Sequence, residues 1–328
     1  MRQTLYTVAA YIFALLVSSC AEMEEPPGNS PAGCSPILLT ADSAVTRTRA
    51  GIPEGMYDNF KVYAVSLKSG TPTVEMDNYE VTYQATGWTY ETALQPLCYW
   101  KRDADAYRFT AGSPVSDVTS LDSHSLTLQM TNNLAGSALY SHPLVIEAAD
   151  PEFGTAVNIS FGYAHCRVRV AFIKDDAEDV AVTGIRLTPD APITSKANMT
   201  FSYDWEANPA AVTSLVSTTE TSSAAFTYAD VNIPAHTGEP VPSATMHYCI
   251  PNAANPQGWQ ITLTCQGEAK AASFENNTPW VSGKSYTYVF SLDAKTPKLV
   301  QVITGDEDFF DCEDILPGDS FTDNDMTE

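Results

Sequence analysis

The chain has 328 residues, of which 40 are acidic and 17 are basic, giving a formal net charge of −23. Binding to nucleic acid requires a basic footprint on the protein surface, and adsorption to anionic lipid headgroups also requires positive charge. Hydrophobic residues make up 44% of the chain, a normal value for a globular protein. The composition therefore excludes a nucleic-acid-binding protein and a generally disordered chain.

The N-terminus has the organisation of a secretion signal. Arg2 precedes an apolar run over residues 8–17, which is followed by Ser18, Ser19 and Cys20. A charged start, a short apolar core and small residues at its end are the parts of such a signal. The run is shorter than the roughly 20 residues that span a bilayer, so it does not predict a transmembrane helix.

The end of this run, Val17-Ser18-Ser19-Cys20, resembles the lipobox of bacterial lipoproteins. The resemblance implies that residues 1–19 are removed as a lipoprotein signal peptide. Cys20 would be the lipidation site, carrying acyl chains such as palmitate, and would become the new N-terminus. Several acyl chains give the stable anchoring that one chain does not supply. The alternative is an ordinary secretion signal with a chance cysteine.

The segment after Cys20 reads as a tether. Residues 21–35 are rich in Pro, Gly and Ser and lack apolar periodicity, which predicts a solvated spacer. Glu22, Glu24 and Glu25 resemble the acidic signals that send some lipoproteins to the outer face of the outer membrane, although a plain polar spacer accounts for them equally well. The expected location is the cell outer membrane, with the body exposed at the surface.

Residues 57–292 are dominated by apolar residues that alternate with polar ones. The clearest period-two runs are Tyr79/Val81/Tyr83, Leu126/Leu128/Met130, Met199/Phe201/Tyr203/Trp205, Ile261/Leu263/Cys265 and Tyr286/Tyr288/Phe290/Leu292. Such alternation is typical of antiparallel sheets with one face in the core and the other in water. No long stretch shows a helical apolar stripe. The pattern predicts an all-β protein.

The turn at Asp150-Pro151 is expected to divide the body into two domains. The predicted domains are antiparallel, Greek-key-like β-sandwiches over residues 50–150 and 151–297. Domains of about 100–150 residues are of ordinary size.

Residues 157–172 change their apolar parity. Val157 to Tyr163 place apolar side chains at odd positions, whereas Cys166 to Phe172 place them at even positions. A one-residue bulge near residues 162–165 would keep both sets on the core face of one strand.

The C-terminal segment, residues 298–328, has two parts. Residues 298–303 (KLVQVI) are a short apolar run that can form one more strand. Residues 304–328 contain ten acidic residues and no Lys or Arg, and self-repulsion favours an extended acidic tail there.

The sequence contains no recognisable catalytic or metal-binding motif. The histidines lack metal-ligand spacing and are His124, His142, His165, His236 and His247. His165 borders a core strand, where a hydrogen-bonded structural histidine is expected. The acidic run 306–308 is expected to be solvated rather than a calcium site. The prediction is a protein that is not an enzyme, with no catalytic residues, no metal site and no cofactor. Carboxylate pairs for glycoside hydrolysis stay open, because they come together only in the fold.

Tryptophans and cysteines have two possible roles each. The tryptophans could line a sugar platform, but burial in a sandwich core is commoner; they are Trp88, Trp100, Trp205, Trp259 and Trp280. Cys166 and Cys265 share the parity of buried residues. Buried free thiols are therefore expected rather than a disulfide framework.

A candidate strand lies directly before a pair of arginines. Residues 37–45 (ILLTADSAV) form the candidate strand, and Arg47 and Arg49 follow in a segment flanked by Thr and Gly. Exposed polar segments are where proteolysis concentrates. Cleavage here would free the body from the lipid and would remove the strand. The alternative is an uncut linker with two solvated arginines.

The order of these features resembles the fimbrillin family, the subunits of type V pili in anaerobic Gram-negative bacteria. The segments that carry the resemblance are short and spread over most of the chain. They are the lipobox and residues 46–51 (TRTRAG), 60–65 (FKVYAV), 87–90 (GWTY), 99–100 (YW), 107–109 (YRF), 157–170 and 280–292 (WVSGKSYTYVFSL). Residues 157–170 resemble the strand that opens the family's second domain, and 280–292 resemble its closing strand.

The resemblance implies assembly by donor-strand exchange. Cys20 would be lipidated, and an arginine-specific protease would cut between Arg49 and Ala50, with the bond after Arg47 as second choice. Residues 20–49, the tether and the removable N-terminal strand, would then leave, and the vacated groove would accept a strand from another fimbrial subunit. An open sheet edge templates such pairing and must be covered until assembly. After processing, the expected location is the fimbrium, where the protein would act in assembly and cell adhesion.

The C-terminus departs from the pattern of a polymerising stalk subunit, which should end in a longer apolar strand. A tip, accessory or anchor subunit therefore fits the sequence as well as a stalk subunit. The alternative function is a permanently anchored glycan-binding surface lipoprotein that stacks sugars on exposed aromatic side chains.

Overall fold

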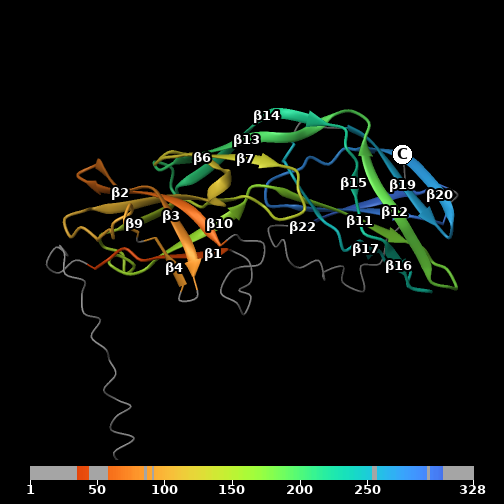
Figure 1. The fold of residues 1–328 in the computed structure, drawn as a ribbon, viewed down its shortest axis with the longest axis horizontal. Helices are drawn as coiled ribbons and strands as arrows, with labels where there is room; N and C mark the ends of the chain where they lie inside the picture. The colour runs from red at the N-terminus through yellow and green to blue at the C-terminus, as the bar shows by residue number, and fades with distance from the viewer. Residues whose placement is uncertain are drawn as a thin grey trace, which may run out of the picture. The chain divides into compact units, whose positions relative to one another are not determined.

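The computed structural model describes residues 35–43, 58–84, 87–90, 92–252, 257–293 and 296–305. These residues form paired β-strands and one short 3-10 helix, Val115–Asp117 (Figure 1). The prediction of an all-β sandwich fold is confirmed. The predicted signal peptide, the lipidation site and all of the tether except Ser35 lie outside the described residues, as does the acidic tail from residue 306 onwards.

The first sheet has eight strands and carries the N-terminal strand at one edge. In spatial order its strands are β1 (Leu39–Ser43), β10 (Val157–Tyr163), β8 (Leu139–Ser141), β5 (Ala106–Ser113), β2 (Asn59–Lys68), β3 (Thr71–Gln84) and β4 (Gly87–Thr89), with β9 (Leu144–Glu147) also paired to β5. One face of this sheet and the loop before β5 enclose a core that includes Phe60, Tyr107 and Phe161.

The second sheet covers the other face of the first. Its order is β14 (Ala211–Ser222), β13 (Ile193–Asp204), β7 (Ser125–Thr131) and β6 (Val118–Leu121). The alternating residues Leu126, Leu128 and Met130 are fully buried, as the period-two pattern predicts. Tyr140 of the first sheet stacks on Phe201 of β13 with ring centroids 4.1 Å apart. The two sheets therefore form one sandwich.

Two further sheets of five strands each enclose a separate core. The third sheet has the order β17 (Val241–Pro242), β11 (Cys166–Ile173), β21 (Ser285–Ser291) and β22 (Lys298–Gly305), with β18 (His247–Cys249) also paired to β11. The fourth has the order β15 (Phe226–Thr227), β12 (Val180–Pro189), β19 (Gln257–Cys265) and β20 (Glu268–Asn276), with β16 (Val231–Ile233) also paired to β12.

The sheets do not divide at the Asp150-Pro151 turn. β10 follows that turn but remains in the first sheet, between β1 and β8. β13 pairs with β7 from Lys196↔Thr131 to Ser202↔Ser125, so β13 and β14 belong to the second sheet. The chain thus leaves the first sandwich after β10, returns for β13 and β14, and leaves again.

The predicted bulge near residues 162–165 is wrong. β10 ends at Tyr163 and β11 begins at Cys166, and the two strands lie in different sheets. Apolar side chains of β10 enter the core of the first sheet, whereas those of β11 enter the core between the third and fourth sheets. The change of parity marks a crossing from one sheet to another. A register shift does occur in β12, between Thr183 and Arg186.

Candidate functional site

The structure places the predicted N-terminal strand within the folded body. β1 forms a parallel ladder with β10, in register from Leu39↔Val157 to Ser43↔Phe161. The Val157 amide donates to the Leu38 carbonyl at 2.8 Å. Arg47, Arg49 and Ala50 lie outside the described residues.

The residues just before β1 pair with a second wall of the site, residues 98–100. The Ile37 amide donates to the Cys98 carbonyl at 2.8 Å, and the Trp100 amide donates to the Ser35 carbonyl at 3.0 Å. The Tyr90 hydroxyl donates to the Ile37 carbonyl at 2.7 Å. Residues 35–37 therefore pair with this loop, and residues 38–43 pair with β10.

Side chains of the segment alternate between core and solvent. Ile37 is fully buried and Leu39 is 3% exposed, and both belong to the core of the first sheet. Leu38 between them is 53% exposed, and Thr40 is also exposed. Full burial of an aliphatic side chain contributes about 1.5–3 kcal/mol. Burial of Ile37 and Leu39 is thus the main hydrophobic contribution that keeps the segment in place.

β1 and β4 are the two ends of the path of strands through the first sheet, yet they lie close together. The sheet therefore curls so that β1 fills the space between β10 and β4. Because β1 is an edge strand, no other ladder passes through it, and β10 keeps its own pairing to β8. β8 pairs with the opposite edge of β10, at Phe161 to Tyr163. Removal of β1 would open the edge of β10 along Val157 to Phe161, the residues that pair with β1, above an apolar groove.

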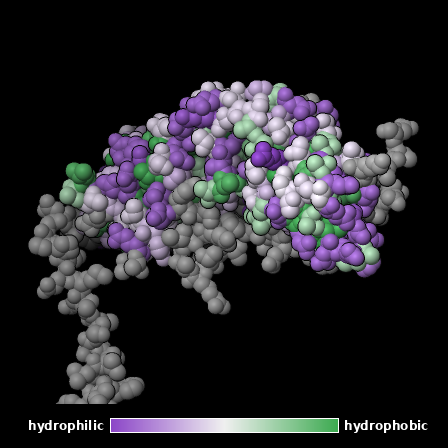
Figure 2. Space-filling model, turned by 45° about the vertical axis from the view of Figure 1, so that its right-hand side comes forward, coloured by the Kyte–Doolittle hydropathy of each residue, from purple (hydrophilic) through white to green (hydrophobic). Residues whose placement is uncertain are grey.

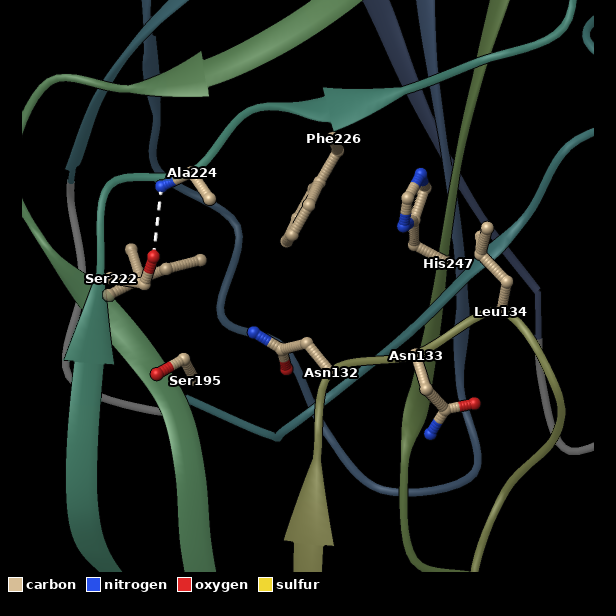
Figure 3. Close-up of a pocket in the computed structure, with 9 residues that line it drawn as sticks. Asn132, Asn133, Leu134, Ser195, Ser222, Ala224, Phe226 and His247 are labelled. Atoms are coloured by element: carbon tan, nitrogen blue, oxygen red, sulfur yellow. Dashed lines mark hydrogen bonds between the residues drawn. The ribbon is translucent and has the colours of Figure 1, made fainter.

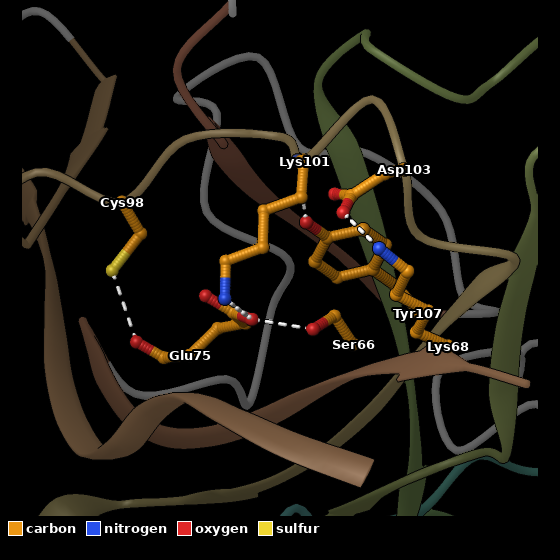
Figure 4. Close-up of polar contacts among 7 residues, drawn as sticks. All are labelled: Ser66, Lys68, Glu75, Cys98, Lys101, Asp103 and Tyr107. Carbon is orange, nitrogen blue, oxygen red and sulfur yellow. Dashed lines mark hydrogen bonds and ion pairs between the residues drawn. The ribbon is translucent and has the colours of Figure 1, made fainter. Parts of the chain in front are cut away.

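A polar cluster braces the 98–100 wall from the side of β3 (Figure 4). The Glu75 carboxylate accepts from the Ser66 hydroxyl at 2.5 Å and from the Lys101 ammonium at 2.6 Å. The Cys98 thiol donates to the Glu75 carbonyl at 3.1 Å, and the Lys101 amide donates to the Tyr107 hydroxyl at 2.7 Å. These partners belong to β2, β3 and β5 or the loop itself, so the wall is held without help from residues 35–43.

Titration of the same region is governed by burial. Burial and the neighbouring Cys98 raise the pKa of Tyr79 to about 12, and burial raises the pKa of the Cys98 thiol. Both groups therefore stay protonated at neutral pH, where Cys98 can act as a donor. Sequence reasoning did not identify Glu75, Tyr90 or Cys98, because nothing in the local pattern shows that their loops flank β1.

The only other strand predicted near a terminus, β22, is also at a sheet edge. It pairs antiparallel with β21, from Ser285↔Gly305 to Ser291↔Lys298. Its outward side chains are largely exposed, including Val300 at 45%.

A pocket of about 280 Å³ lies beside the ends of β7, β13 and β14 (Figure 3). Its lining residues are uncharged or weakly basic and are Asn132, Asn133, Leu134, Ile193, Ser195, Ser222, Ala224, Phe226 and His247. His247 Nε2 lies 2.9 Å from the Thr227 carbonyl, which can only accept, so the hydrogen sits on Nε2 and leaves Nδ1 as an acceptor. Burial lowers the pKa of His247 and favours this neutral form.

Tryptophan side chains do not form a surface platform. Trp100, Trp205, Trp259 and Trp280 are all at most 8% exposed, and Trp88 is half-buried. On the face drawn in Figure 2, hydrophobic residues occur in small separate areas among hydrophilic ones. The expectation of buried sandwich tryptophans is confirmed for these four.

His165 is a buried structural histidine, as its place beside a core strand predicts. Its Nδ1 accepts from the Ala138 amide at 3.1 Å, and Nε2 lies 3.1 Å from the Thr131 carbonyl. Burial lowers its pKa to about 4. Within the described ranges, no group of three or more His, Cys, Asp or Glu side chains could hold a metal ion, and no helix there is long and apolar enough to span a membrane.

Comparison with known proteins gives a family match over most of the chain. A family model described as fimbrillin-like matches residues 46–306. No curated protein matches the chain.

Solved structures show the same fold at low sequence identity. A candidate cell adhesion protein from Bacteroides uniformis is 14% identical, with 85% of this chain and 100% of that chain covered and a TM-score of 0.51. A second candidate cell adhesion protein, from Bacteroides ovatus, is 10% identical, with 83% of this chain and 98% of that chain covered and a TM-score of 0.50.

Proposed function

The chain belongs to the fimbrillin-like family and is a fimbrial or adhesin-like surface protein, and from that premise we propose that it assembles with other fimbrial subunits by donor-strand exchange. In this proposal, residues 35–43 temporarily occupy the groove that runs along residues 98–100 and then along β10. They are replaced by a strand from a neighbouring subunit.

The observation that carries the proposal is the position of β1 at a sheet edge with its apolar side chains in the core. Ile37 and Leu39 are buried in the core of the first sheet, so the groove beneath them must be covered to keep the monomer soluble. No other strand pairs through β1, so its departure leaves the remaining ladders intact. Main-chain pairing along the edge and apolar pockets beneath it are the features used in recognition by strand addition.

Release requires a cut between the strand and β2. The protease would act after Arg49, giving Ala50 as the new N-terminus, or after Arg47. Before that cut, lipid on Cys20 would hold the precursor at the outer membrane. The cut removes the covalent link between β1 and β2, so only noncovalent contacts would then retain β1. β1 and β2 are not neighbours in the sheet, because β10, β8 and β5 lie between them. The proposal applies to a stalk, tip, accessory or anchor subunit.

The test treats the purified full chain with an arginine-specific protease. N-terminal sequencing should find Ala50, and a fluorescent peptide of residues 35–49 should then replace the cleaved fragment, seen as a rise in anisotropy. A peptide with Ile37→Ser and Leu39→Ser serves as the matched control and should not bind. Uncut Arg49→Ala, Arg47→Ala protein should not exchange. Failure of the cleaved protein to take up the native peptide while it stays folded would overturn the proposal.

A second candidate function is recognition of a neutral glycan in the pocket beside Phe226. The pocket combines an aromatic ring with hydroxyl, amide and imidazole groups, the mixture that small polar ligands need. Titration with neutral oligosaccharides should shift the ring resonances of His247, and Ser195→Ala should weaken the shift. Unchanged His247 resonances at millimolar sugar would reject this function.

A further inference from the structure

Two buried cysteines stand directly opposite each other in the core between the third and fourth sheets. Cys166 of β11 and Cys249 of β18 are partners in the antiparallel ladder, and both are fully buried. Cys166 Sγ lies 3.4 Å from the Cys249 carbonyl oxygen. Both are free thiols in the structure, as are Cys98 and Cys265.

The ladder fixes how the two residues face each other. The amide and carbonyl of Tyr248 are both bonded to Asn133, at 2.8 and 2.9 Å. Main-chain groups alternate in direction along a strand, so those of Cys249 point toward Cys166. Such a hydrogen-bonded pair has Cα atoms about 5.5 Å apart. This separation falls within the range of about 4.4–6.8 Å that a disulfide spans.

We infer that Cys166 and Cys249 form a disulfide in the protein as it folds after export. Surface and exported proteins fold where disulfides persist, and the fimbrillin-like family places this chain at the cell surface. Cβ atoms of a hydrogen-bonded pair are about 5.5 Å apart, so the two strands must approach slightly to bring them to the roughly 3.5–4.5 Å of a disulfide. Cys265 lies in the same core, but its ladder partners are Val182 and Glu268, so it has no such facing thiol.

The reaction needs a disulfide as oxidant, either of an exchange enzyme or of a small molecule. One thiol loses its proton and attacks the oxidant, giving a mixed disulfide and one released thiol. The second cysteine thiolate then attacks its partner's sulfur and releases the oxidant's other thiol. Two thiol protons and two electrons pass from the cysteines to the oxidant, which ends as two thiols.

The bond must form before the core closes. In the folded protein both side chains are inaccessible, and burial and the Cys166 thiol raise the pKa of Cys249 well above its usual range. A thiol in that state is a poor nucleophile. Folded reduced protein should therefore oxidise slowly, whereas refolding with an oxidant should give the bond.

The bond would fasten β18, a strand that links two parts of the fold. β18 pairs with β11 on one side and bridges to Asn133 of the β7–β8 loop on the other. The two cysteines are 83 residues apart. Closing so long a loop restricts the unfolded chain strongly.

The test refolds the reduced full chain with a glutathione redox mixture, blocks free thiols by alkylation and maps peptides without reduction. The expected product joins the Cys166 and Cys249 peptides and is lighter than the separate thiol peptides by two hydrogens. Refolding with oxidant should also raise the thermal midpoint by roughly 5–15 °C. Cys265→Ala should keep this rise, whereas Cys166→Ala and Cys249→Ala should abolish it. Recovery of both cysteines as alkylated thiols from folded wild-type protein would overturn the inference, and this outcome does not depend on any variant folding.

Discussion

Substitution of Leu39 by Ala should loosen the N-terminal strand far more than the same substitution one residue earlier. Leu39 is 3% exposed and packs in the core of the first sheet, whereas Leu38 is 53% exposed. Truncation of a buried Leu costs about 2–5 kcal/mol through lost transfer energy and the cavity left behind. An exposed substitution usually changes stability by at most about 0.5 kcal/mol. Leu38→Ala is therefore a matched control of identical chemistry.

The difference in stability between the two variants can be measured as the rate at which the cleaved N-terminal fragment is released. Protein carrying a fluorophore on its N-terminal fragment is cut after Arg49 and diluted into excess unlabelled peptide of residues 35–49, and loss of anisotropy is followed. Since each 1.4 kcal/mol is a factor of ten, Leu39→Ala should release the fragment about 30-fold to several thousand-fold faster than wild type. Leu38→Ala should stay within about threefold of wild type. Equal release rates for the two variants would refute the claim that burial of Leu39 in the core retains the fragment.

Three further predictions concern the rest of the fold. The pKa of His165 falls from 6.5 to about 4 on folding, so the unfolded chain binds the extra proton first. Stability should therefore drop by roughly 3 kcal/mol more than in His165→Gln as pH falls from 6.5 to 4, measured by urea unfolding. Glu75→Gln removes an ion pair between a partly exposed lysine and a carboxylate that is only 10% exposed and should cost about 1–3 kcal/mol. Hydrogen exchange should also show faster exchange at the Ile37 amide. A Cβ at Gly112 would lie 2.6 Å from Leu126 Cδ1, so Gly112→Ala should lower the urea midpoint by an amount equivalent to about 1–3 kcal/mol.

Period-two patterning predicted which side chains of each strand are buried. A sheet with one buried face requires apolar residues at every second position. Leu126, Leu128 and Met130 are all fully buried on β7. The same argument works for β21 only in part, because Val289, on the opposite parity, is also buried. β21 lies between β11 and β22 in the third sheet.

Pairing between distant strands could not be predicted from such patterns. β13 lies beside β7, although each strand alone shows only that one face is apolar. The parity change before Cys166 illustrates the limit. An inserted residue and a crossing between sheets produce the same alternation, and only the tertiary contacts of β10 and β11 distinguish them.

The sequence predicted the strand of the candidate site, β1, but did not predict the residues that surround it. Residues 37–45 contain the observed β1, and their apolar residues indicated a strand. The second wall depends on main-chain groups of Cys98 and Trp100, which carry no sequence signal. The brace by Glu75 likewise depends on where β3 passes the loop.

The most direct test of strand exchange is hydrogen exchange of the body after the N-terminal fragment has been cut and removed. We predict that the amides of Val157, Ile159 and Phe161, which face β1, lose protection while those of β2 and β5 keep it. Adding the peptide of residues 35–49 should restore protection to β10. Loss of protection throughout β2 and β5 would show that the strand is an integral part of the fold. That result would contradict a removable occupant of the groove.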